Sequence, residues 1–204
     1  VLFPGSPLSL QIFEPRYREM IGECLASRTG FGVVLIRTGR EVGGTAVPYD
    51  VGTYAEITHA QRLPDGRFHI EVTGRTRFRI LARDTTSRSF QQADVEYLPD
   101  EEQDAGLAGE ESRELFAQFV NLGLCVTGQY LGDIELPSDA AALAHRIAAR
   151  LSMEMRDKQV LLEAEGPRTR LDLCTQALRQ ELSTLRRQAA AHYLQKYEGF
   201  GAGN

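Results

Sequence analysis

The chain has little of what several classes of protein require. Its 204 residues include no tryptophan, three cysteines and two lysines. Apolar runs are also short: residues 33–36, VVLI, fall far below the roughly 20 residues that a membrane-spanning helix needs. We therefore predict that no segment crosses a membrane.

The cysteines do not suggest a disulfide framework. Cys24, Cys125 and Cys174 are odd in number and far apart, and no CxxC pair of the kind that binds zinc is present. A reducing cytoplasm is therefore the expected location. The chain begins at Val1 instead of a methionine, so we expect a few native residues before it, although nothing in it resembles a secretory signal.

The scarcity of lysine argues against a nucleotide-binding P-loop and against a lysine-activated serine nucleophile. A P-loop holds phosphates with a glycine-rich turn that ends in lysine followed by serine or threonine. Lys158 lies in RDKQ and Lys196 in LQKY, and neither is next to glycine, serine or threonine. No serine is placed as a nucleophile that either lysine would activate. We predict no catalytic residue and no cofactor, and hence no enzyme.

Acidic residues are concentrated in one short stretch. Residues 100–112, DEEQDAGLAGEES, contain six acids and no base, whereas the sections before and after are close to neutral. Few large apolar residues occur there, which is typical of a solvated connection. We therefore predict a lobe at residues 1–99, an acidic linker at 100–112 and a second lobe at 113–204.

Short strand patterns dominate the first lobe. Strands are predicted at residues 8–13, at 31–37 and, three of them, within 51–81. Asp65 and Gly66 indicate a two-residue hairpin turn of type I′, which needs positive φ at both positions. One helix interrupts the strands at residues 15–27, where Pro15 suits the first helical position.

After residue 112 the apolar residues recur every three or four positions. Helices are predicted near residues 115–122, 140–151 and 157–164, and from Pro167 to just before Gly199. The fold class is therefore α+β: a mostly-β lobe with one helix, followed by an all-helical lobe that ends in a long helix.

Several sequence segments resemble the motifs of one known family and occur in the same order. They are LFPGSPLSLQIFEPRYREM, FGVVLI, VGTYAEI, LPDGRFHIEVTGRTRFRI, and LSMEMRDKQVLLE before a long leucine-rich helix. Together they cover nearly the whole chain and resemble the amino-terminal (LON) domain of Lon-type ATP-dependent proteases. The resemblance implies a PUA-like β lobe followed by a helical lobe, in agreement with the apolar patterns.

The resemblance also implies binding without catalysis. Domains of this family capture unfolded or degron-bearing polypeptides, so the expected partner is an extended polypeptide or another protein, a protease ATPase among them. Full-length Lon proteases continue into ATPase and Ser-Lys proteolytic modules that are not found in this sequence, which therefore resembles stand-alone LON-domain proteins. Whether the chain forms a homo-oligomer stays open.

The candidate peptide-binding residues lie in and near the loop at residues 38–52, TGREVGGTAVPYDVG. Adjacent glycines make the loop adaptable, and apolar and aromatic side chains follow them. These candidates are Val47, Pro48, Tyr49 and Tyr54. The alternative is that they cover the interior of the lobe. An exposed strand edge is another way to hold an extended peptide.

An RNA-binding surface is the alternative function. Arg75, Arg77 and Arg79 alternate along one strand and would share a face that could meet phosphates. Against this, the lobe is nearly neutral and Glu71 lies on a neighbouring strand. We interpret the row as a solvated, salt-bridged face, and a nucleic-acid partner is the less favoured prediction.

Two histidines raise the question of a metal site. The predicted two-residue turn would place His59 opposite Val72 and His69 opposite Arg62, so that the histidines face opposite sides of the hairpin. A zinc site also needs further ligands. No metal is predicted.

Overall fold

The computed structural model describes residues 1–39, 46–101, 104–127 and 136–198, with the backbone alone at 124–127 and 189–198. The chain forms two compact units. Val1–Glu101 and Met153–Ala164 make the first unit, and Glu102–Ser152 with Glu165–Asn204 the second. Among the described helices, none is long and apolar enough to cross a bilayer.

An antiparallel sheet organises the first unit. Its strands are β1 (Pro7–Ile12), β2 (Phe31–Val33), β5 (Val51–Arg62), β6 (Phe68–Asp84) and β7 (Gln92–Leu98). The order is β1-β6-β5-β2, and β7 pairs with the later half of β6. A separate pair consists of β3 (Ile36–Thr38) and β4 (Val47–Pro48).

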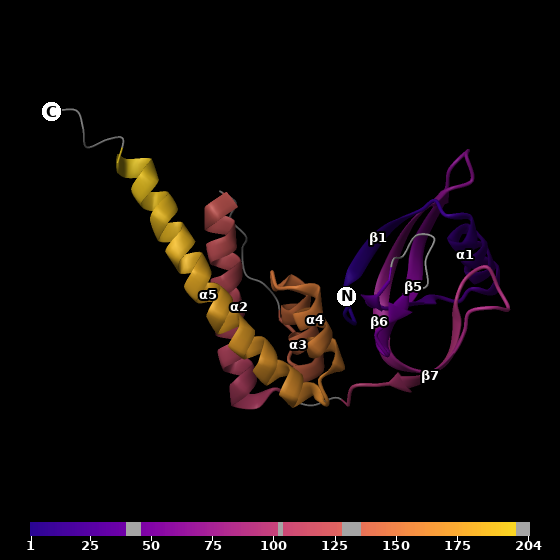
Figure 1. Cartoon of the computed structure of the whole chain (residues 1–204). Helices are drawn as coiled ribbons and strands as arrows, with labels where there is room; N and C mark the ends of the chain where they lie inside the picture. Colours follow the sequence, from indigo (N-terminus) through magenta and orange to yellow (C-terminus); the bar gives the residue numbers. More distant parts are fainter. Residues whose placement is uncertain (40–45, 102–103, 128–135, 199–204) are drawn as a thin grey trace. The chain divides into compact units, whose positions relative to one another are not determined.

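The core of the first unit lies between this sheet and α1 (Pro15–Ser27), which packs on one face of the sheet (Figure 1). Alternate residues of β1 point inward, because Leu10 and Ile12 pair with Ile70 and Phe68 of β6 and belong to the same apolar cluster. Ile21 of α1 is fully buried against them. The helix occupies the predicted residues.

The β5–β6 hairpin has a three-residue loop instead of the predicted two-residue turn. The N–H of Leu63 donates to the carbonyl of Arg67 at 2.8 Å, and the N–H of Gly66 donates to the carbonyl of Leu63 at 2.9 Å. Pro64 occupies the second position of this turn, where its fixed negative φ fits a type I turn and not a type I′ turn. Only Gly66 takes a positive φ, of 80°.

This loop shifts the strand register by one residue and reverses the prediction for the histidines. His59 lies opposite Glu71, and His69 lies opposite Gln61. Because partners in a ladder point to the same face, the two histidines share a face. Even so, the part of the chain that the structure describes contains no group of three side chains able to hold a metal ion.

One helix of the later half of the chain belongs to the first unit. It is α4 (Met155–Glu163), and its Leu161 and Leu162 are buried. Gln159 donates through Nε2 to the carbonyl of Val51 at 2.9 Å. The predicted boundaries, with a lobe at 113–204, differ from the structure here because the chain returns to the sheet after α3 (Ala140–Arg150).

The second unit is made of α2 (Gly106–Thr127), α3 (Ala140–Arg150) and α5 (Pro167–Glu198). α2 and α5 lie alongside each other (Figure 1), and the hydroxyls of Ser112 and Thr175 share a hydrogen bond of 2.7 Å between them. The predicted fold class, mostly β and then helical, is confirmed.

The predicted acidic linker is only partly a solvated connection. α2 begins inside it at Gly106, and Ala105 is fully buried. Asp100 is the partner of a buried arginine, described below. The linker prediction counted charges, but small residues such as Ala105 and Ser112 supply buried positions without adding large apolar side chains.

Candidate functional site

The first two candidate residues have different environments. Val47 is 38% exposed, whereas Pro48 is buried. Both lie in β4, which pairs with β3. Residues 40–45 of the same predicted loop lie outside the described residues. Of this pair, only Val47 offers apolar surface.

Tyr49 is partly covered by an arginine. The guanidinium carbon of Arg37 lies 4.8 Å from the centroid of the Tyr49 ring, and Arg37 also pairs with Asp50 at 3.2 Å. The N–H of Tyr49 donates to the carbonyl of Leu35 at 2.8 Å. One face of this ring is therefore already occupied.

Tyr54 has a structural contact. Its hydroxyl accepts a hydrogen bond of 2.6 Å from the N–H of Gly30, at the turn between α1 and β2. A Cβ at Gly30 would lie 2.8 Å from the Tyr54 ring, so the glycine permits this close approach. The ring also meets Tyr97 edge to face, with centroids 6.2 Å apart.

Tyr97 is a surface aromatic that the sequence analysis did not identify. It lies on β7 and is 54% exposed. Val95 points to the same face two residues earlier. Among the described strands, β7 pairs with β6 alone, so its other edge has no ladder partner. We call β7 together with Tyr97, Val95 and Tyr54 the β7 surface.

The arginine row divides into two kinds of environment. Arg75 forms an ion pair with Glu56, and Arg79 with Glu96 at 3.5 Å. All four side chains are about half exposed. These are solvated surface ion pairs, as predicted. Their acidic partners are Glu56 and Glu96, and not the expected Glu71.

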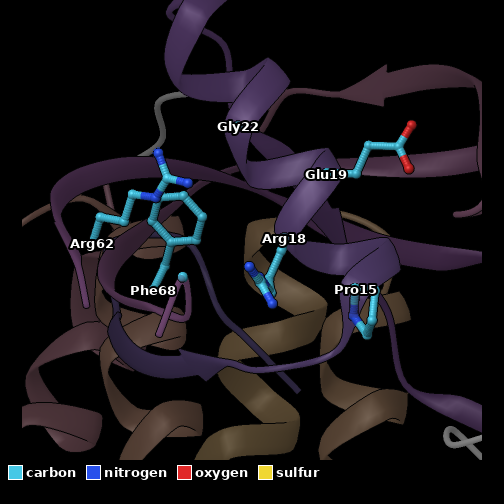
Figure 2. A pocket seen from close by; sticks show the side chains of 7 residues that line it. Pro15, Arg18, Glu19, Gly22, Arg62 and Phe68 are labelled. Carbon is cyan, nitrogen blue, oxygen red and sulfur yellow. The ribbon is translucent and has the colours of Figure 1, made fainter. Parts of the chain in front are cut away.

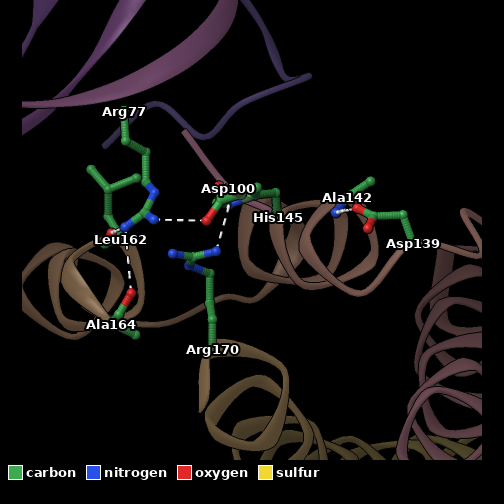
Figure 3. Close-up of polar contacts among 8 residues, drawn as sticks. All are labelled: Arg77, Asp100, Asp139, Ala142, His145, Leu162, Ala164 and Arg170. Carbon is green, nitrogen blue, oxygen red and sulfur yellow. Dashed lines mark hydrogen bonds and ion pairs between the residues drawn. The ribbon is translucent and has the colours of Figure 1, made fainter. Parts of the chain in front are cut away.

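Arg77 is buried, with 6% of its surface exposed. It forms an ion pair of 2.7 Å with Asp100 and donates to the carbonyl of Leu162 at 2.9 Å (Figure 3). A longer contact of 3.4 Å reaches the carbonyl of Ala164. Its guanidinium is thus committed inside the first unit, and the three arginines do not form one accessible row.

Comparison with known proteins identifies the family. A family model for the ATP-dependent protease La (LON) substrate-binding domain matches residues 1–180. The chain belongs to this family. Two relatives are the Lon proteases of Rhizobium meliloti (strain 1021), 30% identical over 140 residues, and Trichlorobacter lovleyi, 28% identical over 197 residues.

These matches cover 67% and 93% of this chain, but 17% and 24% of the two relatives. The chain therefore spans less than a quarter of their length. A solved structure of a Lon N-terminal domain protein from Xanthomonas campestris has a TM-score of 0.62 at 24% identity, covering 84% of this chain and 89% of that one. The N-terminal domain of a Mycobacterium avium complex Lon protease has a TM-score of 0.59 at 17% identity, covering 87% and 92%.

Proposed function

We propose that this LON domain binds unfolded or extended polypeptide without catalysing a reaction, and that the β7 surface holds the segment by strand addition. The observation that carries the proposal is Tyr97, an exposed aromatic on a strand with an open edge among the described strands. The family match supports the general function, because the matched model describes a substrate-binding domain.

Strand addition suits polypeptides of varied sequence. The unpaired N–H and C=O groups of β7 would supply hydrogen bonds to any extended backbone. Tyr97 and Val95 would contact alternate side chains of that segment. Because ordering a flexible peptide offsets much of the contact energy, we expect affinities around micromolar.

Binding of a protein partner, such as a protease ATPase, is compatible with the same surface. The Lon proteases among the relatives are much longer than this chain, so we assign it polypeptide binding alone. RNA binding is less well supported, because Arg75 and Arg79 are paired with acids and Arg77 is buried.

Substitution of Tyr97 tests the proposal. For a fluorescent, unstructured peptide of about 12 residues, Tyr97→Ala should weaken binding about tenfold or more, as for an aromatic residue at the centre of an interface. Fluorescence anisotropy measures the affinity. Tyr49→Ala is the matched control, since it removes the aromatic ring of the loop that the sequence indicated.

A loss of affinity with Tyr49→Ala but not with Tyr97→Ala would place the peptide on that loop and contradict the β7 surface. Salt separates the two partner classes. Raising it from about 50 to 200 mM should change the affinity of an amidated peptide without acidic residues little, whereas phosphate contacts would lose orders of magnitude.

A further inference from the structure

A pocket lies between α1 and the β5–β6 hairpin, apart from the residues of the β7 surface (Figure 2). Its volume is about 420 Å³. α1 and the hairpin supply the lining: Pro15, Arg18, Glu19, Gly22, Arg62, Gly66 and Phe68. Two cations, an aromatic ring and two glycines thus border one hollow.

The two cations of the pocket lack acidic partners at contact distance. Within the described part of the chain, neither the Arg18 nor the Arg62 side chain makes a hydrogen bond or an ion pair, and the Arg62 guanidinium lies 5.9 Å from the centroid of the Phe68 ring. Asp65, the acid of the hairpin loop, is engaged by Arg67 at 2.6 Å. The pKa of Asp65 is lowered chiefly by the hydrogen bond from the Arg67 backbone, and Arg18 adds only a weaker, more distant attraction.

The one acid in the lining does not neutralise them. Glu19 accepts a hydrogen bond of 2.6 Å from the hydroxyl of Ser89. Figure 2 shows its carboxylate pointing away from the guanidinium groups of Arg18 and Arg62. Both cations therefore remain available to a ligand, which must bring its own negative charge.

Because Gly66 has no side chain, the guanidinium of Arg18 can lie close to the backbone of the turn. A Cβ at this position would lie 2.1 Å from a terminal nitrogen of Arg18. The glycine also needs its positive φ of 80° for the hairpin turn. The turn that orders the hairpin thus leaves room for a guanidinium to rest over its backbone.

We propose that this pocket binds a carboxylate of the bound polypeptide, either its C-terminus or an acidic side chain. Guanidinium groups bind carboxylates through paired, charge-assisted hydrogen bonds. The ring of Phe68 and the ring of Pro15 would contact the apolar atoms next to that carboxylate. This inference rests on the proposed function, since it names the chemical group that the polypeptide presents.

Phosphates of RNA fit the pocket less well. Single-stranded nucleic acids are held by aromatic faces on which bases stack. The lining offers a single aromatic residue, Phe68, for such stacking. A small carboxylate flanked by apolar atoms needs no such platform.

Three forms of one fluorescent peptide test the pocket at low salt. The peptide contains Ala, Ser, Leu and Val and ends in Leu; it is made as the free acid, as the amide, and as an amide with one internal Glu. We expect the free acid, the internal Glu form or both to bind roughly tenfold more tightly than the plain amide, as for one charge-assisted contact. Arg18→Gln or Arg62→Gln should remove that preference, whereas Arg156→Gln, an exposed arginine of α4, should keep it.

A second measurement does not depend on peptide binding elsewhere. N-acetyl-leucine at about 10 mM should shift the NMR signals of the Arg18 and Arg62 side chains, and its amide should not. If all three peptides bind equally and these signals do not move, the pocket proposal is overturned while polypeptide binding stands. If no peptide binds, the proposed function fails, and the pocket proposal, which rests on it, fails with it. Tight binding of a single-stranded RNA that Arg18→Gln abolishes would also overturn it.

Discussion

Three arginines of one sequence pattern can differ widely in their contribution to stability, as Arg77 shows. Arg75, Arg77 and Arg79 follow one another at intervals of two, and the sequence offers no reason to separate them. Only the structure shows that Arg77 meets the last turn of α4 at Leu162, 85 residues later. A contact over that sequence distance leaves no local signal, because it depends on which helix packs where.

This difference gives a prediction for stability. Arg77→Ala should lower the free energy of unfolding by about 3–5 kcal/mol, because it removes a buried ion pair with Asp100 and the hydrogen bonds to two carbonyl groups. Arg79→Ala removes an exposed pair and should cost less than about 1 kcal/mol. Urea titration followed by circular dichroism measures both. Equal losses of stability in the two variants would show that the buried contacts of Arg77 stabilise the protein no more than the exposed pair of Arg79.

At the scale of single elements, the sequence predicted which segments form the first sheet better than it predicted their pairing. α1 and the turn between β5 and β6 were expected at the places where they occur, but the three strands predicted within residues 51–81 are two, because β6 runs unbroken from Phe68 to Asp84. The register of the hairpin was not, because Asp-Gly was given more weight than Pro64, whose ring decides the turn type.

β7 shows a different limit of prediction from the sequence. Its residues QADVEYL alternate polar and apolar side chains, a usable signal that the sequence analysis passed over. Its position at a sheet edge could not have been predicted, because it follows from strand order. For that reason the candidate loop around Val47 and Tyr49 was identifiable from the sequence, and the β7 surface was not.

Alanine substitutions at two glycines of the pocket should change the free energy of unfolding in opposite directions. A Cβ at Gly22, inside α1, would meet no neighbouring side chain within 4 Å, so Gly22→Ala should raise the free energy of unfolding by about 0.5–1 kcal/mol through helix propensity. Gly66→Ala should lower it by about 1 kcal/mol or more, since alanine disfavours a positive φ. Urea titration of both variants measures this difference. Stabilisation by Gly66→Ala would contradict the three-residue turn.

At the scale of the whole molecule, the units do not follow the order of the chain. The sequence predicted one boundary near residue 100, whereas the chain leaves the first unit after Glu101, returns for Met153–Ala164 and leaves again. Apolar periodicity identifies α4 as a helix but does not say which core its apolar face joins. Hydrogen bonds from Gln159 to Val51 and from Arg77 to the carbonyl of Leu162 decide this, and they form only in the folded unit.

The first unit should therefore be incomplete when it is cut at the boundary that the sequence suggests. A fragment of residues 1–101 lacks α4, so the carbonyl of Val51 loses its donor and Arg77 loses two acceptors. Joining residues 153–164 to it through a flexible linker of about 15 residues restores these contacts. We expect the joined fragment to be more stable by about 2–4 kcal/mol, from one neutral and one charged buried hydrogen bond, and to melt about 10 °C higher.

The matched control carries Gln159→Ala in the joined fragment, which keeps the linker and the helix but removes the donor to the carbonyl of Val51. It should lose about 0.5–1.5 kcal/mol of the gain, the typical net contribution of one hydrogen bond. Thermal melts followed by circular dichroism compare the three fragments. If residues 1–101 melt as high as the joined fragment, α4 adds nothing to the first unit, and a simple boundary near residue 100 would describe the protein after all.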